Sequence, residues 1–365
     1  MYKKSYFFIM FFILFSTGIF AQNVFRTPIP VLPESDFTPV ISKVADGSED
    51  ADSTDLSLQS QLKKDLAINQ FLPGYWQIKH GNKAEGIAEM FSWPLMIVGN
   101  ILLVDYLIDN DIFDSEFYTE SNNYHYCWYS EGLENPSNKW EMYSALVLSS
   151  GASFLYSYSL YSAEEDYYNM VDPNYSKQYG ETLSIGDVLA APWQPENLLN
   201  FDFFPVYPLF AMLGTMDSSS FQDIVDYFKR DSVSILGADV HPVAGLAMAL
   251  SASMLLANLS TTTEELTFRS HLLREKGIHL SSITFGAVHL ANMTLPNTSV
   301  ESTIFQALFA TLFGYYAGYK TQENGYDFRR MIALHFWHNV TVMTLDYILN
   351  PDEAYYFTIG AEFSF

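Results

Sequence analysis

The sequence predicts an all-α, polytopic membrane protein built as a helical bundle of about eight apolar segments. Charged residues make up only 16% of the 365-residue chain, below the roughly 25% of ordinary soluble domains. Aromatic residues also make up 16%. Apolar runs recur along the chain, and such runs are typical of helices in a bilayer. Low charge, many aromatics and repeated apolar runs together favour a membrane protein.

Residues 1–21 have the pattern of a secretory signal peptide. Lys3 and Lys4 form the charged region, residues 6–20 form the apolar core, and Ala21 offers a cleavage point. An uncleaved membrane anchor is the competing interpretation. Both interpretations send the chain to a membrane, and we expect a multi-pass protein of the bacterial cell membrane.

The remainder divides by composition into four parts. Residues 22–70 are polar and acidic, which predicts a mostly disordered exported linker. Residues 71–235 form an N-terminal membrane region with acidic loops, and residues 236–349 form the membrane domain that carries the motifs described below. Residues 350–365 form a C-terminal tail, in which the alternation of YYFTIGAEFSF indicates a strand.

The apolar segments alternate with polar loops. Several are shorter than the roughly 20 residues that cross a bilayer squarely, which suits helices inside a bundle. The expected segments cover about 88–108, 142–161, 200–216, 236–258, 262–275, 279–292, 301–319 and 331–349.

The net charge of −24 reflects 42 acidic residues against 18 basic ones. A nucleic-acid partner needs clustered lysine and arginine to neutralise phosphates. The charge balance therefore argues against nucleic acid, and the expected surroundings are a lipid bilayer.

The stretch TEELTFRSHLLREKG places charges after an uncharged apolar run. In a helix, Glu265 and Arg269 lie four residues apart and share a face. Glu264 is rotated by about 100° from Glu265. Arg269 is therefore predicted to pair with Glu265, while Glu264 points to a different neighbour. Ionisable groups at membrane depth are candidates for function.

Two later segments carry matching polar pairs. FGAVH puts Phe285 and His289 four residues apart, and HFWHN puts His335 and Asn339 four residues apart on a helical face. His338 lies one residue off that second face. Side chains from facing helices can converge in the core of a bundle. The spacing therefore predicts one site built from Glu264, His289, His335 and Asn339.

These residue types suit hydrolysis by an activated water. A partly desolvated glutamate can take a proton from water, and a histidine can share that role or bind a metal. A second histidine and an asparagine amide can donate hydrogen bonds to an oxyanion. The sequence has no GxSxG, no HExxH and no plausible cysteine nucleophile. The set therefore favours an enzyme that hydrolyses an amide with water.

The motifs EELTFR, FGAVH and HFWHN, in this order, resemble the EExxxR, FxxxH and HxxxN/D motifs of the CPBP family, also called the Abi family. It comprises CAAX prenyl endopeptidases and bacteriocin-processing proteins. The resemblance covers about 236–349 and implies a CPBP-type core of an α-helical intramembrane protease, which acts on a membrane-associated peptide or protein.

The resemblance also implies roles for single residues. Glu264 and His289 would activate the water, and Glu265 and Arg269 would support the first motif. His335 with Asn339 would bind a metal or stabilise the oxyanion. Both a zinc protease, with His289 and His335 as ligands, and a metal-free glutamate protease remain open.

Two other classes remain as alternatives. A catalytically silent helical membrane protein, acting as a scaffold or binding a peptide, would keep the same helices. An outer-membrane β-barrel would account for the alternating C-terminal residues, but barrels need at least eight such strands and the sequence has one clear candidate.

Overall fold

A computed structural model describes residues 49–109, 118–120, 123–125, 139–172, 174–199, 221–235, 238–290 and 300–349. The described residues are mostly helical, and their strands form two short antiparallel hairpins. An all-α class is therefore confirmed for this part of the chain. The expected signal peptide, the segment 200–216 and the C-terminal tail lie outside the described residues.

The first half of the chain contributes one very long helix, α6, and several shorter ones. In chain order these elements are α2 (Glu49–Phe71), α3 (Tyr75–His80), α4 (Lys83–Met90), α5 (Ser92–Asp109), β1 (Tyr118–Glu120), β2 (Asn123–His125), α6 (Lys139–Val171), α7 (Tyr175–Tyr179), α8 (Ile185–Ala190), the 3₁₀ turn η2 (Ala191–Trp193) and α9 (Pro195–Leu198).

The second half contributes the helices that carry the motifs. They are preceded by α11 (Phe221–Lys229) and the hairpin of β3 (Val233–Ile235) with β4 (Ala238–Val240). The motif-bearing elements are α12 (Pro242–Glu265), the π-helical turn η3 (Leu266–His271), α13 (Leu272–Val288), α14 (Val300–Glu323) and α15 (Arg329–Leu349).

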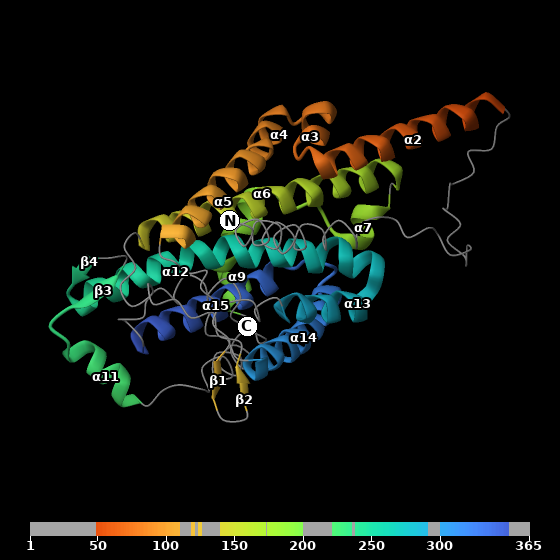
Figure 1. Ribbon diagram of the computed structural model, residues 1–365. Coiled ribbons are helices and arrows are strands. Elements are labelled where there is room, and N and C mark those ends of the chain that lie inside the picture. Colours follow the sequence, from red (N-terminus) through yellow and green to blue (C-terminus); the bar gives the residue numbers. More distant parts are fainter. Residues whose placement is uncertain are drawn as a thin grey trace.

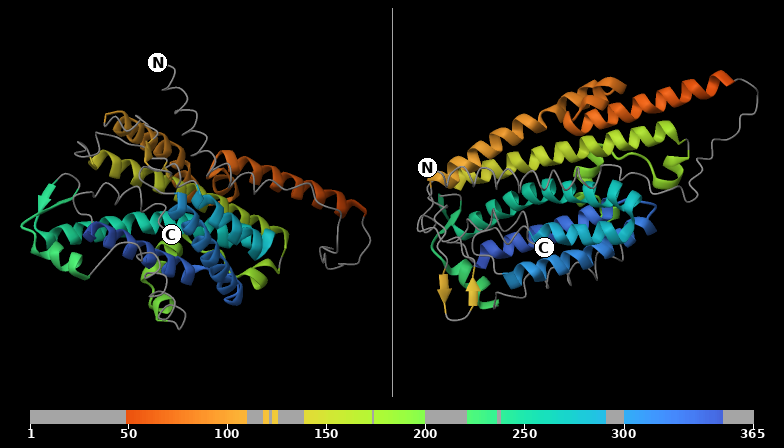
Figure 2. Two further views of the ribbon diagram at one scale, coloured as in Figure 1. Left: turned by 60° about the horizontal axis from the view of Figure 1, so that its bottom comes forward. Right: turned by 45° about the vertical axis from the view of Figure 1, so that its right-hand side comes forward.

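The long helices stack in layers. Helices α2 to α5 lie along one side of α6, and α12 packs against α6 from the other side (Figure 1). Beyond α12 lies α15, and the pair α13 and α14 packs beside it, as the right-hand view of Figure 2 shows. Helix α12 is thus covered by α6 and by α15, which makes it the central helix of the described bundle.

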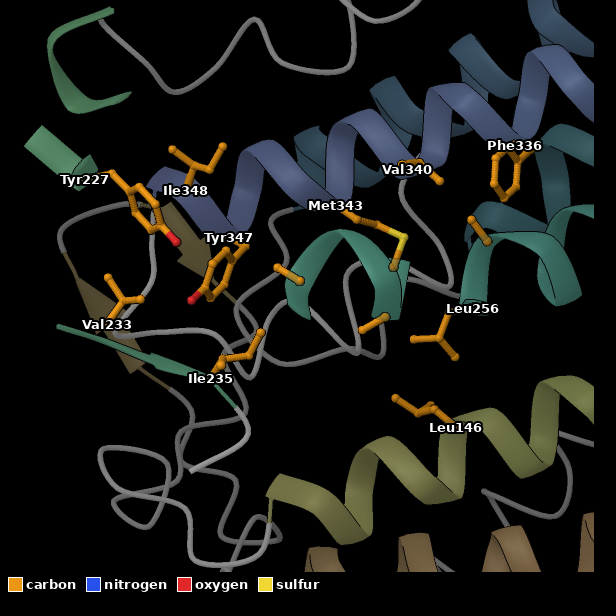
Figure 3. Packing of buried hydrophobic residues seen from close by; sticks show 13 residues of the cluster. Leu146, Tyr227, Val233, Ile235, Leu256, Phe336, Val340, Met343, Tyr347 and Ile348 are labelled. Carbon is orange, nitrogen blue, oxygen red and sulfur yellow. The ribbon is translucent and has the colours of Figure 1, made fainter. Parts of the chain in front are cut away.

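The largest apolar cluster joins α6, α12 and α15. Leu146 of α6, Leu256 of α12 and Phe336 of α15 meet in it, and Figure 3 shows their side chains pointing into the space between these helices. Tyr227 and Tyr347 close the cluster at the end near the β3–β4 hairpin. This packing fixes the distance between α12 and α15, on which the motif residues lie.

Local sequence explains where α12 begins. Pro242 stands at its first turn, where a missing N–H is harmless, and the His241 side chain accepts a hydrogen bond from the N–H of Val243. The apolar run that follows is rich in alanine and leucine, which favour helix. Within the described residues, the stretch Pro242–Ser270 is long and apolar enough to cross a membrane.

Two expectations differ from the observed elements. The ranges 236–258 and 262–275 were predicted as separate segments, but one helix runs through residues 259–261 and continues into η3. The break comes later, at Gly277, whose φ of 77° lies in the left-handed region that favours glycine. No breaker interrupts residues 259–261, so the helix continues.

The predicted disordered linker is wrong for its second half, because residues 49–71 form α2. Composition suggested disorder, but the helix has a packing partner. Leu62 is buried in a cluster with Trp76 and Tyr167. Asp65 is also buried, where it bonds Lys79. Contacts with α3 and α6 therefore stabilise a helix that its own composition does not favour.

Candidate functional site

The first motif lies where α12 gives way to the π-helical turn η3. Hydroxyl groups bond carbonyls four residues back throughout this stretch: Thr263 bonds Leu259, Thr267 bonds Thr263, and Ser270 bonds Leu266. Such side-chain bonds satisfy carbonyls where a helix departs from regular geometry. Short π-helical turns occur frequently at functional sites.

The predicted pairing of Glu265 with Arg269 is confirmed. Nε of Arg269 lies 3.2 Å from Oε2 of Glu265, and neither side chain has exposed surface. Arg269 also donates a 3.3 Å hydrogen bond to Oγ of Ser281, and its guanidinium lies 4.7 Å from the ring centre of Phe285. The arginine is therefore held on three sides, and it neutralises a buried carboxylate.

His335 lies between the two glutamates. Its Nδ1 is 2.9 Å from Oε1 of Glu265, and its Nε2 is 3.7 Å from Oε2 of Glu264. The ring of His335 is fully buried, whereas the Glu264 side chain is 22% exposed. The carboxylate of Glu265 thus orients a histidine from a helix 70 residues further along the chain. Of the two glutamates, only Glu264 has exposed side-chain surface, and its Oε2, which faces His335, is buried.

His289 directly follows α13, and a backbone carbonyl determines which of its ring nitrogens carries the proton. Its Nδ1 lies 2.7 Å from the carbonyl oxygen of Phe285, the first residue of the same motif. A carbonyl only accepts, so Nδ1 carries the proton and a neutral ring has its lone pair on Nε2. The Phe285 ring centre lies 5.0 Å from that of His289 and 6.0 Å from that of His335. Phe285 thus contacts both histidines of the predicted site.

Asn339 lies one turn after His335 on α15 and is 4% exposed. Its amide nitrogen donates a 3.2 Å hydrogen bond to Oγ1 of Thr261 on α12. An amide nitrogen has two donors, so this bond orients the group and leaves a second N–H for another acceptor. His338, predicted to lie off this face, is fully buried and its ring lies 6.0 Å from that of Phe309.

The structure brings five of the six predicted site residues into one chain of contacts: Glu264, Glu265, Arg269, His335 and, through Phe285, His289. Asn339 lies on the same helix, α15, as His335. The pairing of Glu264 with His289 around a water stays a prediction.

Sequence reasoning missed the supporting residues Ser281 and Thr261. Ser281 donates to the carbonyl of Phe268 at 2.6 Å while it accepts from Arg269. Its only sequence signal is a position one helical turn before Phe285. A serine in an apolar helix is too common for that signal to be informative.

The predicted metal ligands His289 and His335 would give a zinc ion two protein ligands. A catalytic zinc normally takes three protein ligands. Within the part of the chain that the structure describes, no three histidine, cysteine, aspartate or glutamate side chains form a group that could hold a metal. Nδ1 of His335 faces Glu265, an arrangement that leaves Nε2 as the nitrogen able to bind a ligand. Zinc binding by His289 and His335 stays a prediction.

Comparisons with known proteins give no match to this chain among family models, curated proteins or solved structures.

Proposed function

We propose that this chain is an intramembrane endopeptidase with a CPBP-type core, which hydrolyses a peptide bond of a membrane-associated peptide or protein. The observation that carries the proposal is the contact of His335 with both glutamates. A buried carboxylate, paired with a buried arginine, orients this histidine towards a second, partly exposed carboxylate. Carboxylate and imidazole so arranged are suited to proton transfer.

Glu264 is the proposed general base. It is the partly exposed glutamate, so a water can reach it. Glu264 takes a proton from that water, with Nε2 of His289 accepting a hydrogen bond from the same water. The resulting hydroxide attacks the carbonyl carbon of the peptide. When the C–N bond breaks, the proton held by Glu264 passes to the leaving amine nitrogen.

Asn339 and His335 are the proposed groups that stabilise the oxyanion. The second N–H of Asn339 can donate directly. His335 directs Nδ1 to Glu265, so its Nε2 donates only when the ring carries both protons. Glu265 is already paired with Arg269, so the negative charge of the oxyanion itself compensates the positive charge of that imidazolium. No step in this route depends on a metal.

A multi-pass location in the membrane is part of the proposal. Large apolar side chains lie on the outside of the described bundle while charged groups lie inside it. Leu308 and Leu312 of α14 are 61% and 67% exposed, whereas Glu265 and Arg269 are fully buried. Ile97 of α5 is likewise exposed. Exposed apolar faces around a polar interior are what contact with lipid chains requires.

Close approach of helices supports the same view. Gly286 of α13 packs against Ala307 and Thr311 of α14, and Gly314 of α14 packs against Ser282. A side chain at either glycine would meet the facing helix. Small residues at such contacts are typical of helices that associate within a bilayer.

The test is a cleavage assay on the full chain purified in detergent, with a peptide library as substrate. We expect the wild type to cleave library members and Glu264→Ala to be inactive while keeping its helical content. Equal cleavage by the two proteins would exclude the proposed mechanism. Peptide binding without cleavage by the wild type would instead favour the scaffold. Activity that withstands a chelator would favour the metal-free glutamate route, and loss of activity that zinc restores would favour the metal route with His289 and His335 as ligands.

A further inference from the structure

Another buried carboxyl group lies far from the motif residues, on the short helix α4. Glu89 has no exposed surface, and its Oε1 accepts a hydrogen bond at 3.5 Å from the hydroxyl of Ser162 on α6. Helix α4 precedes the apolar helix α5 and packs against α3, α5 and α6. The role proposed for the chain above makes no use of this residue.

Glu89 belongs to a buried polar layer that attaches α3 and α4 to α6. The amide of Gln77 donates to Ser162 and to the carbonyl oxygen of Ser159. The N–H of Gly74 donates to the Ser159 hydroxyl at 2.8 Å, and Asn69 donates to the Ser159 carbonyl oxygen at 3.0 Å. Apart from Glu89, every side chain in this layer is neutral. The layer holds the two short helices by hydrogen bonds.

The described residues place no positive charge against Glu89. Among the residues that the structure describes, no lysine, arginine or histidine forms an ion pair with it. The basic side chains of α3, Lys79 and His80, both bond Asp65 of α2. The charged groups that act on Glu89 are Glu85 of its own helix and Asp166 of α6, and both are acids.

An unpaired charge in such a place is costly, and a carboxyl group avoids it by keeping its proton. Burial and the neighbouring acids Glu85 and Asp166 favour the protonated carboxyl of Glu89, whereas the hydrogen bonds from Ser159 and Ser162 favour its charged form. Burial is the largest of these effects.

We propose that Glu89 is a proton-binding site, and that the proton it holds keeps α3 and α4 docked on α6. The proposal does not depend on the endopeptidase activity. The docked form holds a proton that the undocked form releases above about pH 4.5. Docking is therefore strongest at low pH and weakens as rising pH removes the proton from Glu89.

The experiment measures hydrogen exchange of the α3 and α4 amides in detergent, as protection factors, between about pH 6 and about pH 9. It compares the wild type with Glu89→Gln and with the matched control Glu85→Gln, which changes a glutamate one turn earlier on the same helix. We expect protection to fall with rising pH in the wild type and in Glu85→Gln, and to stay constant in Glu89→Gln.

Three results would overturn the proposal. The first is a Glu89→Gln profile that falls with pH like that of the wild type. The second is protection that sodium ions restore at high pH, since the site would then bind a metal cation. The third is an infrared carbonyl band of a protonated carboxylic acid that is unchanged at neutral pH by Glu89→Gln. If Glu89→Gln does not fold, Glu89→Asp replaces it and must keep a pH-dependent profile.

Discussion

Glu265 of α12 and His335 of α15 are joined by a 2.9 Å contact between Oε1 and Nδ1, with both side chains fully buried. The same carboxylate pairs with Arg269 through its other oxygen. Glu265 therefore fixes which nitrogen of His335 carries a proton, and with it the chemistry that Nε2 can perform.

Glu265→Gln should reduce activity without removing the general base. Glutamine is neutral, so Arg269 loses the carboxylate of its ion pair, and an amide N–H that faces Nδ1 would also change the tautomer of His335. Loss of a group that orients a histidine typically reduces activity about 10–100-fold. The measurement is kcat/KM in the peptide assay, with the exposed Glu323→Gln as control. A Glu265→Gln enzyme as active as wild type would contradict the orienting role.

Arg269→Ala should lower stability as well as activity. It leaves Glu265 as a buried charge without its partner, and breaking a buried ion pair on one side costs about 3–5 kcal/mol. The variant should therefore melt earlier in detergent and give a lower yield. The exposed Arg230→Ala serves as the control substitution. A melting temperature equal to that of the wild type would show that the pair has no structural role.

Glu264→Gln should abolish catalysis while the fold is kept. Removal of a general base slows a reaction by a factor of roughly 10²–10⁴. Glutamine is the neutral isostere of glutamate. Because Glu264 is partly exposed, its replacement by glutamine leaves no unpaired charge in the interior. The single-turnover rate and the melting temperature are both measured on the same preparation of Glu264→Gln, and each is compared with that of the wild type. A variant that loses both together would indicate a structural residue instead.

Asn339→Ala should slow the chemical step by about 10²–10³, the usual effect of losing one oxyanion donor. It also removes the hydrogen bond to Thr261, so a second variant separates the two effects. Thr261→Val removes that bond while keeping the amide, and it should lower the rate much less. Equal losses in the two variants would point to packing between α12 and α15 as the cause.

A capping interaction outside the site gives a pH-dependent prediction. The Ser184 hydroxyl and backbone N–H both bond the Asp187 carboxylate at the start of α8, and they lower the pKa of Asp187. This stabilisation is present above the ordinary pKa of 3.8 and is lost as the pH falls below it. Ser184→Ala should cost about 0.5–2 kcal/mol at neutral pH.

The measurement is thermal unfolding followed by circular dichroism at neutral and acidic pH. The difference in melting temperature between the wild type and Asp187→Asn should become smaller as the pH is lowered. The exposed substitution Asp231→Asn serves as the control. A difference in melting temperature that is independent of pH would mean that the charge of the Asp187 carboxylate does not stabilise the fold.

Spacing alone predicted one contact between residues that are close in the chain. Glu265 and Arg269 are separated by four residues, so the spacing predicted their pairing. The same spacing placed Phe285 and His289 on one face, but it did not predict the hydrogen bond between Nδ1 of His289 and the Phe285 carbonyl. The contact of Glu265 with His335 spans 70 residues and depends on how α12 packs on α15. No periodicity encodes that packing, which is why the sequence predicted convergence without predicting these partners.

Composition was misleading where tertiary contacts decide the structure. Residues 49–70 have the acidic, polar character of a disordered segment, yet Leu62 and Asn69 are buried against α3 and α6. The tertiary contacts of these two side chains outweigh the average composition of the segment. The same limit explains why the supporting Ser281 gave no recognisable signal.

The three hydroxyl bonds around η3 have a consequence for how this region could vary. Thr263, Thr267 and Ser270 bond the backbone carbonyls directly, so the widened turn is specified by small uncharged side chains. The acidic pair and the arginine could then be exchanged for neutral residues while the path of the chain stays the same. The charged side chains supply the chemistry of this turn, and the hydroxyl side chains specify its shape. A chain that had lost the charged residues could still keep the π-helical turn.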